Sequence, residues 1–391
     1  MEFKFDVAII GGLGHVGLPL GIVFADKLLR VLLIDINIDS AKQVESGKMP
    51  FVEYGAEELL QNALSKELLT ISSNYSDVKE AKNVIICIGT PIDEYLNPKT
   101  KGFLSAIEKY SEYITKEQLV IIRSSVYPGT CKQVHRVLGE SINLSYCPER
   151  IVQGYAIREL SNLPQIVSGF SQEATDKASD LFKIITKDIV MATISQAELS
   201  KLFSNAWRYI QFAATNQFYM ICAESGENYN DIRNIMMHGY ERMSGFPSSG
   251  FTAGPCLLKD TMQLANISAN AHYLSQAAMH INEGMPSFLV RMLKNTHSLV
   301  GAKVGILGMA FKADIDDTRD SLSFKLKKLL AFEGAEVLCT DAFADYPDLL
   351  SLDYVLLNSE IIIIGAPHTI YKNINISAKV KVLDIWDILS T

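Results

Sequence analysis

The fold of the N-terminal half is decided by one stretch, Gly11-Gly12-Leu13-Gly14-His15-Val16-Gly17, which directly follows the strand-like run Asp6–Ile10. Within it, Gly12, Gly14 and Gly17 have the spacing G-x-G-x-x-G. The first glycine allows a sharp turn, the second lets a pyrophosphate approach the backbone, and the third lets a helix pack on the strand. The amides that open the following helix then face the phosphates. The stretch therefore predicts a strand–turn–helix unit that binds a dinucleotide.

An acidic residue, Asp35, ends the second strand-like run, Val31–Ile34. It follows the turn at about the distance that dinucleotide-binding units require. A carboxylate at this place accepts hydrogen bonds from ribose hydroxyls and repels a 2′-phosphate, so we predict NAD rather than NADP. The alternative is a glycine-rich turn that binds nothing. From this stretch we expect these cofactor contacts: Gly12, Gly14, His15, Val16, Gly17 and Asp35.

Further strand-like runs alternate with helical stretches, which indicates a parallel sheet covered by helices. These runs are Asn83–Ile88, Leu119–Arg123 and Ile166–Ser168. Because ligand groups gather at the carboxyl ends of strands in such sheets, the residues after the third and fourth strands are candidates for cofactor binding. They are Gly89, Thr90, Pro91, Ser124 and Ser125. The alternative for the two serines is an ordinary loop hydroxyl.

The second half of the chain begins with a long helical pattern over Ser195–Glu224, without Pro or Gly until Gly226. Such a helix bridges domains or packs against a partner subunit. A second α/β pattern then follows in the runs Lys303–Leu307, Val337–Thr340, Ile361–Ile364 and Val380–Ile385. The fold class we predict is α/β, with three domains: an N-terminal Rossmann domain at 1–194, a helical middle domain at 195–295 and a C-terminal Rossmann-like domain at 296–391.

The composition narrows the class of protein. The chain has 391 residues and a formal net charge of −8, which argues against a non-specific nucleic-acid binder. Its six cysteines are scattered without a C-x-x-C pair or metal-ligand spacing, so we expect free thiols, a reducing compartment and no metal site. There is no apolar stretch of membrane-spanning length and no signal-like N-terminus. We therefore expect a cytoplasmic protein with no membrane partner.

One cysteine stands in a Gly- and Pro-containing run at residues 250–260, GFTAGPCLLKD. Glycine and proline allow tight bends there, and Lys259 places a positive charge close to Cys256 in the sequence, which favours the nucleophilic thiolate. A dehydrogenase with such a thiol can carry an aldehyde onward to an acid. The alternative is a small core residue, which is the commoner fate of a free cysteine.

Further motifs occur in order along the chain: Glu53–Gly55 (EYG), Cys147–Arg150 (CPER), 198–205 (ELSKLFSN), 308–312 (GMAFK), 316–321 (DDTRDS), 366–368 (APH) and 384–386 (DIW). With GLGHVGLP at 12–19, Gly89–Pro91 and the cysteine run, they cover nearly the whole sequence. In these motifs the chain resembles the UDP-glucose/GDP-mannose dehydrogenase family, the nucleotide-sugar 6-dehydrogenases.

The resemblance implies an N-terminal Rossmann domain for NAD, a central helical dimerisation region and a C-terminal Rossmann-like domain for the nucleotide diphosphate. It also implies oxidation of the C6 hydroxyl of a UDP-sugar to a carboxylate, with two NAD in one site, a homodimer, and a role in polysaccharide biosynthesis. In the family a cysteine at the position of Cys256 forms a thiohemiacetal, whose oxidation gives a thioester that water cleaves.

The resemblance also assigns roles to the candidate catalytic residues, which are Cys256, Lys201, Asn205, Glu149, Asp260 and Ser125. Lys201 and Asn205 share one face of the long helix because they are four residues apart, and their family counterparts stabilise developing oxyanions or relay protons. Glu149 matches a carboxylate for thioester hydrolysis and Asp260 one that orders the water. Two alternatives stay open: Lys201 as an exposed lysine, and Glu149 as a salt-bridge partner of Arg150.

Substrate and cofactor contacts follow from the resemblance in the same way. Arg319 matches a residue that contacts NAD, and Arg242 is expected to reach a substrate across the dimer interface, since its planar fork suits phosphate or carboxylate. Each of these arginines, and Lys312 as well, could instead be a plain surface cation. The expected substrate contacts are Glu149, Arg150, Lys201, Asn205, Arg242, Phe251, Phe311 and Lys312.

The chain also departs from the family pattern. Ser125 stands where Thr is usual, Gln153 replaces a common Pro, and Pro255 removes an N–H beside the cysteine. The CPER motif favours a UDP-N-acetylhexosamine as substrate, whereas Lys259-Asp260 favours UDP-glucose. Two other functions remain as alternatives: a two-electron NAD dehydrogenase of a smaller hydroxyacid, and a non-catalytic nucleotide-sugar binder.

Overall fold

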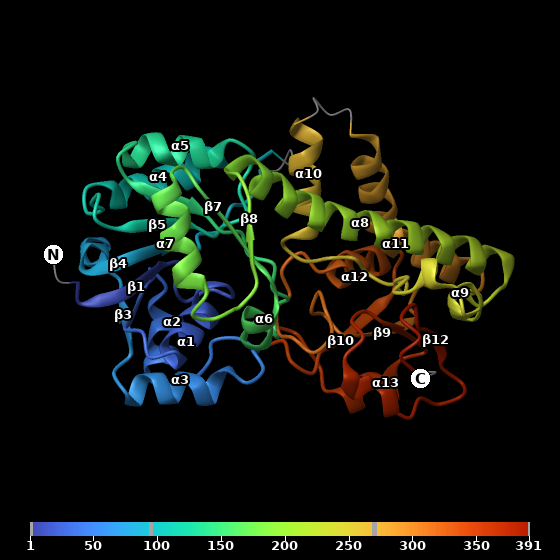
Figure 1. Ribbon diagram of the computed structural model, residues 1–391. Helices are drawn as coiled ribbons and strands as arrows, with labels where there is room; N and C mark the ends of the chain where they lie inside the picture. Colours follow the sequence, from blue (N-terminus) through green and yellow to red (C-terminus); the bar gives the residue numbers. More distant parts are fainter. Residues whose placement is uncertain (1–2, 94–96, 268–271, 390–391) are drawn as a thin grey trace. The chain divides into compact units, whose positions relative to one another are not determined.

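The computed structural model describes residues 3–93, 97–267 and 272–389. Its internal contacts divide the chain into two compact units, Met1–Phe203 and Ser204–Thr391. The division falls within one helix, α8 (Ile194–Ser225). Each unit has its own β-sheet (Figure 1).

The described part of the N-terminal unit holds an eight-stranded sheet with the order β3-β2-β1-β4-β5-β6-β7-β8. Neighbouring strands run parallel except β6 and β7, which are antiparallel. Because β1 is central and the chain moves outward from it in both directions, the strand order reverses between β1 and β4. The strands are β1 (Phe5–Ile10), β2 (Val31–Ile34), β3 (Leu69–Ser72), β4 (Ala81–Ile86), β5 (Leu119–Ile122), β6 (Asn143–Tyr146), β7 (Gln165–Gly169) and β8 (Ile189–Met191).

Helices cover both faces of this sheet (Figure 1). One face packs against α1 (Gly17–Asp26), α2 (Ile38–Glu45), α3 (Ala56–Ser65), α6 (Ala156–Asn162) and α7 (Gln172–Phe182). The other packs against η1 (Tyr75–Glu80), α4 (Thr100–Ser111) and α5 (Thr130–Leu138). The central strands are apolar on both faces, as a sheet buried between two helical layers requires.

The predicted fold class is confirmed, and the five predicted strands of this unit correspond to β1, β2, β4, β5 and β7. Sequence patterns missed β3, β6 and β8. β8 has only three residues, and β3 and β6 carry polar side chains within four-residue strands. The expectation of a parallel sheet is wrong at one place, the antiparallel pair β6–β7. An antiparallel edge on a parallel sheet is common in such folds.

The C-terminal unit contains, in its described residues, a parallel four-stranded sheet with the order β10-β9-β11-β12. Its strands are β9 (Lys303–Leu307), β10 (Glu336–Thr340), β11 (Ile361–Ile364) and β12 (Lys381–Leu383). One face packs against α11 (Tyr273–Lys294) and α12 (Leu322–Phe332), and the other against α13 (Leu352–Asn358) and η3 (Thr369–Asn373). The predicted strand Val380–Ile385 ends early because the Asp384 carboxylate accepts from the Trp386 and Leu389 amides and closes a turn.

The helical part of the same unit comprises the rest of α8 with α9 (Tyr229–Met237), η2 (Glu241–Met243), α10 (Leu257–Ile267) and α11. The predicted long helix, Ser195–Glu224, is confirmed as α8. Buried amide side chains link its elements. Asn282 Nδ2 donates to Tyr209 O at 3.1 Å, Asn216 Nδ2 donates to Asn282 Oδ1 at 2.9 Å, and Asn216 Oδ1 accepts from Gly250 N at 3.0 Å. This chain ties the loop that carries the cysteine run to α8 and α11.

Of the helices in the described residues, none has the length and apolar content needed to cross a membrane.

Candidate active site

The three glycines of the first turn differ in the room around them. A Cβ atom on Gly12 would lie 2.8 Å from Ile9 O and from Leu33 Cβ, and one on Gly17 would lie 2.9 Å from Gly12 Cα. Near Gly14 the closest atom is Gly11 O, at 3.7 Å. The packing of the protein itself therefore requires the first and third glycines. The space at the second leaves room for an approaching ligand such as the pyrophosphate of NAD.

Asp35 follows β2 and supports this turn. Its Oδ2 accepts from Leu13 N at 3.0 Å and its Oδ1 accepts from Asn37 N at 3.1 Å. The side chain is only partly buried, and an ionised carboxylate has about four acceptor positions. The group can thus hold the turn and still accept from ribose hydroxyls, so the residues present fit NAD.

His15 of the turn contacts a residue that the sequence had marked only as a departure. Gln153 Nε2 lies 3.0 Å from His15 Nδ1, and the His15 ring lies 4.0 Å from the Phe51 ring, centroid to centroid. Gln153 belongs to a loop that Glu53 holds, because the Glu53 carboxylate accepts from Gly154 N at 3.1 Å. The EYG motif at Glu53 and the loop after the CPER motif therefore meet beside the predicted cofactor turn.

The residues after β4 and β5 meet at the carboxyl end of the sheet. Thr90 Oγ1 donates to Ser125 O at 2.5 Å, and Ser124 Oγ donates to Ile86 O at 3.2 Å. Ser124 is buried and Ser125 is partly exposed. Four further predicted contacts follow β1, β4 or β5 at the same edge: Val16, Gly89, Pro91 and Ser125.

Glu149 follows β6 and forms a buried ion pair with Arg123 Nη2. Its other oxygen accepts from Ile151 N, and Glu149 is only 7% exposed. The suggested salt bridge to Arg150 is wrong in its partner: Arg150 Nη2 donates to Pro164 O. Arg123 was predicted only as the end of a strand. Because it also donates to Gln165 Oε1 at 2.9 Å, Arg123 is itself fixed in place and orients the Glu149 carboxylate.

Lys201 is buried on α8, at 8% exposed. One turn earlier on the same helix, the Glu198 carboxylate accepts from Gly129 N at 2.8 Å and from Cys131 N at 3.0 Å. These amides open α5, where a helix terminus favours negative charge. Glu198 therefore fixes the start of α8, and with it the place of Lys201 in the N-terminal unit. The alternative of an exposed lysine is wrong.

In the C-terminal unit, Cys256 immediately precedes α10 and is exposed. Asp260 N donates to Cys256 O at 2.9 Å, the first helical hydrogen bond. Asp260 is buried, and its Oδ2 accepts from Asn205 Nδ2 at 2.6 Å. Lys259 Nζ lies 3.1 Å from Asp260 Oδ1. The sequence had placed the Lys259 charge near the thiol, and the structure pairs that charge with Asp260.

Two aromatic residues distant in sequence set the path of the cysteine loop. Gly250 has φ +147° and packs against the Trp386 indole, and Gly254 has φ +97° with its Cα facing the Phe311 ring. A Cβ on Gly254 would lie 2.6 Å from Phe311 Cδ2. Gly254 N also donates to Asp320 O at 3.4 Å. The loop is thus shaped by the C-terminal sheet, which places Phe311 beside the residues that lead to Cys256.

The remaining candidates of this unit have different surroundings. The guanidinium of Arg319 donates to both carboxylate oxygens of Asp317, at 2.6–3.0 Å. Hydrogen bonds to Asp317 raise the pKa of Arg319, and attraction to Cys256 adds to the rise. Arg242 is exposed and lies against the Tyr240 ring, 5.8 Å from its centroid. Phe251 is 5% exposed and belongs to the hydrophobic core, and Lys312 is partly buried.

Sequence reasoning gave no role to several residues that shape these sites. They are Arg123, Glu198, Asp341 and His368. For Asp341 a signal existed, because it stands directly after the second strand of its sheet, as Asp35 does. For Arg123 no such signal existed, since its partners lie 26 and 42 residues away. Among the described side chains, no group of three or more His, Cys, Asp or Glu is placed to hold a metal ion.

Comparison with known proteins covers almost the whole chain. Three profiles of the UDP-glucose/GDP-mannose dehydrogenase family match it: the NAD binding domain at residues 5–186, the central domain at 195–284 and the UDP binding domain at 305–391. A UDP-N-acetyl-D-mannosamine dehydrogenase of Methanocaldococcus jannaschii is 30% identical over 397 residues, which cover 97% of this chain and 92% of the relative.

Solved structures resemble the chain over the same extent. The UDP-D-ManNAc dehydrogenase from Pyrococcus horikoshii superposes with a TM-score of 0.90 at 27% identity, covering 98% of this chain and 96% of that one. A UDP-glucose dehydrogenase from Pyrobaculum islandicum superposes with a TM-score of 0.89 at 23% identity, covering 98% and 94%. At that identity the second likeness concerns the fold alone.

Substitution of the turn glycines should separate packing from ligand binding. We expect Gly17→Ala to destabilise the N-terminal unit by about 1–3 kcal/mol, because its Cβ meets backbone atoms. Gly14→Ala should unfold within about 2 °C of the wild type but bind NADH at least about tenfold more weakly. Gly102→Ala, on open space in α4, is the control. Calorimetric unfolding and NADH titration test this. Equal NADH affinity in Gly14→Ala and wild type would contradict it.

The thiols should differ sharply in reactivity. Burial raises the pKa of Cys87 and of Cys147 to about 12 and raises that of Cys131 well above its usual range. These groups stay protonated at pH 8, whereas Cys256 is exposed at a helix N-terminus, where the thiolate is favoured. Iodoacetamide at pH 8 should therefore modify Cys256 at least about tenfold faster than the other three. Peptide mass spectrometry measures the rates, and Cys256→Ser should remove the fast phase. Faster modification of a buried cysteine would refute this order.

Proposed function

The chain belongs to the UDP-glucose/GDP-mannose dehydrogenase family, and from this premise we propose that it oxidises the C6 hydroxyl of a UDP-N-acetylhexosamine to the carboxylate. It is an NAD-dependent nucleotide-sugar dehydrogenase. Among the sugars, UDP-N-acetyl-D-mannosamine comes first, because the relative at 30% identity and the solved structure at 27% identity are named for it. UDP-glucose is the second candidate, since the Lys259-Asp260 pair favours that branch.

One arrangement carries the proposal. The exposed Cys256 stands at the start of α10, and one turn later Asp260 is buried and held by Asn205. This pairing lies in the same unit as the sheet that matches the UDP binding domain. A thiol, an oriented carboxylate and a nucleotide-binding sheet in one unit suit an oxidation that proceeds beyond the aldehyde.

The first oxidation needs a group that stabilises charge on the C6 oxygen. NAD, when bound in the N-terminal unit, would supply the hydride acceptor for each of the two oxidations at C6. We assign the oxygen of C6 to Lys201 and Asn205, which are one turn apart on α8 and both 8% exposed. In a site shielded from water, one well-placed donor of this kind contributes about 3 kcal/mol. Ser125, in the loop after β5, is the further hydroxyl that we place near the reacting group.

The second oxidation uses the thiol. The Cys256 sulfur adds to the aldehyde carbon, and the aldehyde oxygen takes a proton to give the thiohemiacetal. Loss of hydride from its carbon and of the hydroxyl proton gives a thioester. Water then attacks the carbonyl carbon and the C–S bond breaks. One proton of the water passes to the sulfur, the other is released, and the sugar leaves as the carboxylate. We propose that Asp260 orders this water and that Glu149, held by Arg123, assists the hydrolysis.

In our proposal the nucleotide-sugar is held by residues of the turn after β9, of the loop after β6 and of the segment that leads to Cys256. Phe311 packs against Gly254, so a sugar nucleotide bound at Phe311 and Lys312 would lie close to the cysteine loop. Arg150 and Arg242 offer guanidinium groups for phosphate or carboxylate. Phe251, which packs in the hydrophobic core, would support the cysteine loop from within. Arg319, paired with Asp317, is assigned to NAD.

We also propose the organisation of the chain from its family. We propose three domains, 1–194, 195–295 and 296–391, a cytoplasmic location and assembly as a homodimer. Trp207, Phe218 and Ile221 support the dimer, because they are 60%, 41% and 52% exposed and are separated by nearly whole numbers of turns on α8. An exposed apolar stripe of this kind is typical of a contact surface.

An assay across nucleotide sugars tests the function. UDP-N-acetyl-D-mannosamine, UDP-GlcNAc, UDP-GalNAc, UDP-glucose and GDP-mannose are each supplied with NAD, and NADH and product mass are recorded. We expect two NADH per sugar and a uronic acid with a UDP-N-acetylhexosamine. Oxidation of UDP-glucose alone would refute the choice of sugar.

A cysteine variant serves as the comparison in the same assay. In Cys256→Ser the second oxidation lacks its thiol, so we expect turnover to fall at least about 100-fold and to stop near the aldehyde or ester stage. One NADH per molecule of a small hydroxyacid would instead support the two-electron dehydrogenase. Binding of a UDP-sugar without any NADH, unaffected by Cys256→Ala, would support the non-catalytic binder.

Sedimentation equilibrium tests the dimer. A buried, unpartnered charge in an interface costs about 3 kcal/mol or more, so Ile221→Arg should shift the protein from dimer to monomer. Leu357→Arg, which changes an 85% exposed residue on α13, should leave the dimer intact. A wild-type protein that sediments as a monomer at micromolar concentration would exclude the assembly.

A further inference from the structure

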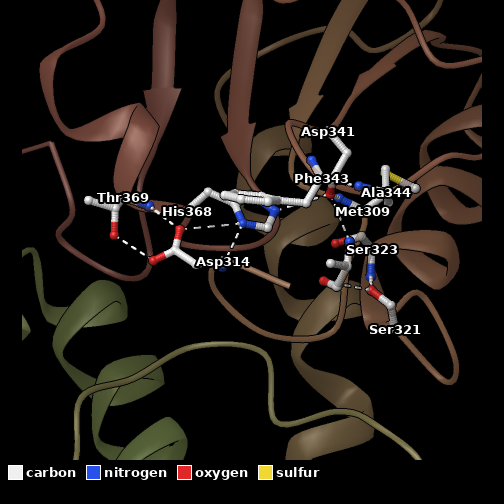
Figure 2. A network of polar contacts seen from close by, with 10 residues as sticks. Met309, Asp314, Ser321, Ser323, Asp341, Phe343, Ala344, His368 and Thr369 are labelled. Atoms are coloured by element: carbon white, nitrogen blue, oxygen red, sulfur yellow. Dashed lines mark hydrogen bonds and ion pairs between the residues drawn. The ribbon is translucent and has the colours of Figure 1, made fainter. Parts of the chain in front are cut away.

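Asp341, directly after β10, has no exposed side-chain surface and accepts five N–H groups (Figure 2). The donors are Met309 N (2.6 Å), Ala310 N (2.9 Å) and His368 Nε2 (3.1 Å) to Oδ2, and Phe343 N (2.8 Å) and Ala344 N (2.9 Å) to Oδ1. Burial alone would raise the pKa of Asp341, but the hydrogen bonds from His368, Ala344 and Phe343 lower it to about 2. The residue is a fixed anion with its acceptor positions occupied.

His368 links this anion to a second part of the same turn. Figure 2 shows its imidazole lying between Asp314 and Asp341. Asp314 N donates to His368 Nδ1 at 2.8 Å. Because a backbone amide can only donate, Nδ1 carries no hydrogen, and Nε2 carries the proton that it donates to Asp341. The side chain of His368 is fully buried, so its two contacts fix both its orientation and its tautomer.

The turn from Gly308 to Asp314 makes further contacts with the loop that contains Thr369. Asp314 adopts φ 56°, which most residues avoid. Its carboxylate accepts from Thr369 N at 2.7 Å and from Thr369 Oγ1 at 2.5 Å. Ser321 Oγ, at the start of α12, donates to Ala310 O at 3.4 Å. The turn from Gly308 to Asp314 is thus held at its beginning by Asp341 and at its end by His368 and Thr369.

This turn carries Phe311 and Lys312, the two side chains that we assign to the nucleotide-sugar. Phe311 also packs against Gly254, in the loop that leads to Cys256. Neither Asp341 nor His368 is accessible, so neither can touch the substrate. Any effect of these two residues on the reaction must therefore pass through the shape of the turn.

We propose that His368 and Asp341 are positioning residues for the nucleotide-sugar, which lock the Gly308–Asp314 turn in the shape that presents Phe311 and Lys312. The proposal rests on the function proposed above. It assigns the pair to substrate affinity and not to the chemistry at C6. NAD is assigned to the N-terminal unit and to Arg319, which lies outside the Gly308–Asp314 turn, so its affinity should not depend on this pair.

Three substitutions divide the role of His368 into its parts. In His368→Asn the amide oxygen can take the place of Nδ1 and accept from Asp314 N, but the donor to Asp341 is lost. In His368→Gln the amide nitrogen can take the place of Nε2 and donate to Asp341, but the acceptor for Asp314 is lost. His368→Leu keeps much of the volume and loses both contacts. Val355→Ala is the control, because it opens a cavity in the same unit at a fully buried residue of α13.

The measurements are the dissociation constant of UDP by calorimetry and, with the active sugar, the KM of each substrate and kcat. We expect His368→Leu to raise the UDP dissociation constant and the KM of the sugar at least tenfold. Its kcat and the KM of NAD should stay within twofold of the wild type. The two amide variants should each raise the sugar KM by about threefold, and Val355→Ala should lower thermal stability without changing any KM.

Several outcomes would overturn the proposal. One is an unchanged UDP affinity in His368→Leu. Another is a loss in His368→Leu that falls equally on kcat and on both KM values, as expected from partial unfolding. If the leucine variant does not fold, wild-type KM values in both amide variants decide against the pair. A wild-type protein that oxidises no nucleotide-sugar but binds UDP would refute the proposed function, and the UDP measurements would still judge the positioning.

Discussion

In each half of this chain, one carboxylate that follows the second strand holds the turn that follows the first strand. Asp35 accepts from Leu13 N, and Asp341 accepts from Met309 N and Ala310 N. A tight turn leaves backbone amides without partners in the sheet, and buried amides need an acceptor. A carboxylate one residue past the neighbouring parallel strand lies at the same edge of the sheet and supplies it. Both proposed sites depend on this constraint, because residues that we assign to their ligands lie on these turns.

The two carboxylates nevertheless serve different ends. Asp35 is partly exposed and accepts from two amides, so it retains capacity for ribose hydroxyls. The side chain of Asp341 is buried and accepts from five donors, one of them the imidazole of His368. In our proposal the first turn binds its ligand through backbone, glycine and carboxylate together. The second turn uses its carboxylate only for shape, and we assign ligand binding to the side chains that the turn carries. The same strand–turn–helix topology would thus support two modes of nucleotide binding.

Much of the fold could be predicted because it is local. Continuous apolar runs such as Val31–Ile34 and Ile361–Ile364 form strands that are buried on both faces of their sheets, and the unbroken helical pattern forms α8. Short strands with polar residues, such as β6, escaped because side-chain pattern alone does not separate them from loops. Glu149 was found as a candidate, but its partner was not. Arg123 and Arg150 look alike in sequence, and only the packing of β5 beside β6 brings Arg123 to the carboxylate.

The sequence by itself determined the order of the motifs, the kinds of chemistry available and the turn that calls for glycine at Gly12, Gly14 and Gly17. Only the tertiary structure decided which polar groups remain able to meet a ligand. Four acidic residues lie beside predicted sites and have different surroundings. Asp35 is partly exposed, and Glu149 is paired with an arginine. Asp260 contacts an asparagine and a lysine, and Asp341 accepts from amides and a histidine. Their partners lie up to 55 residues away. Hydrogen bonding and burial depend on such long-range contacts, which no local pattern of residues encodes.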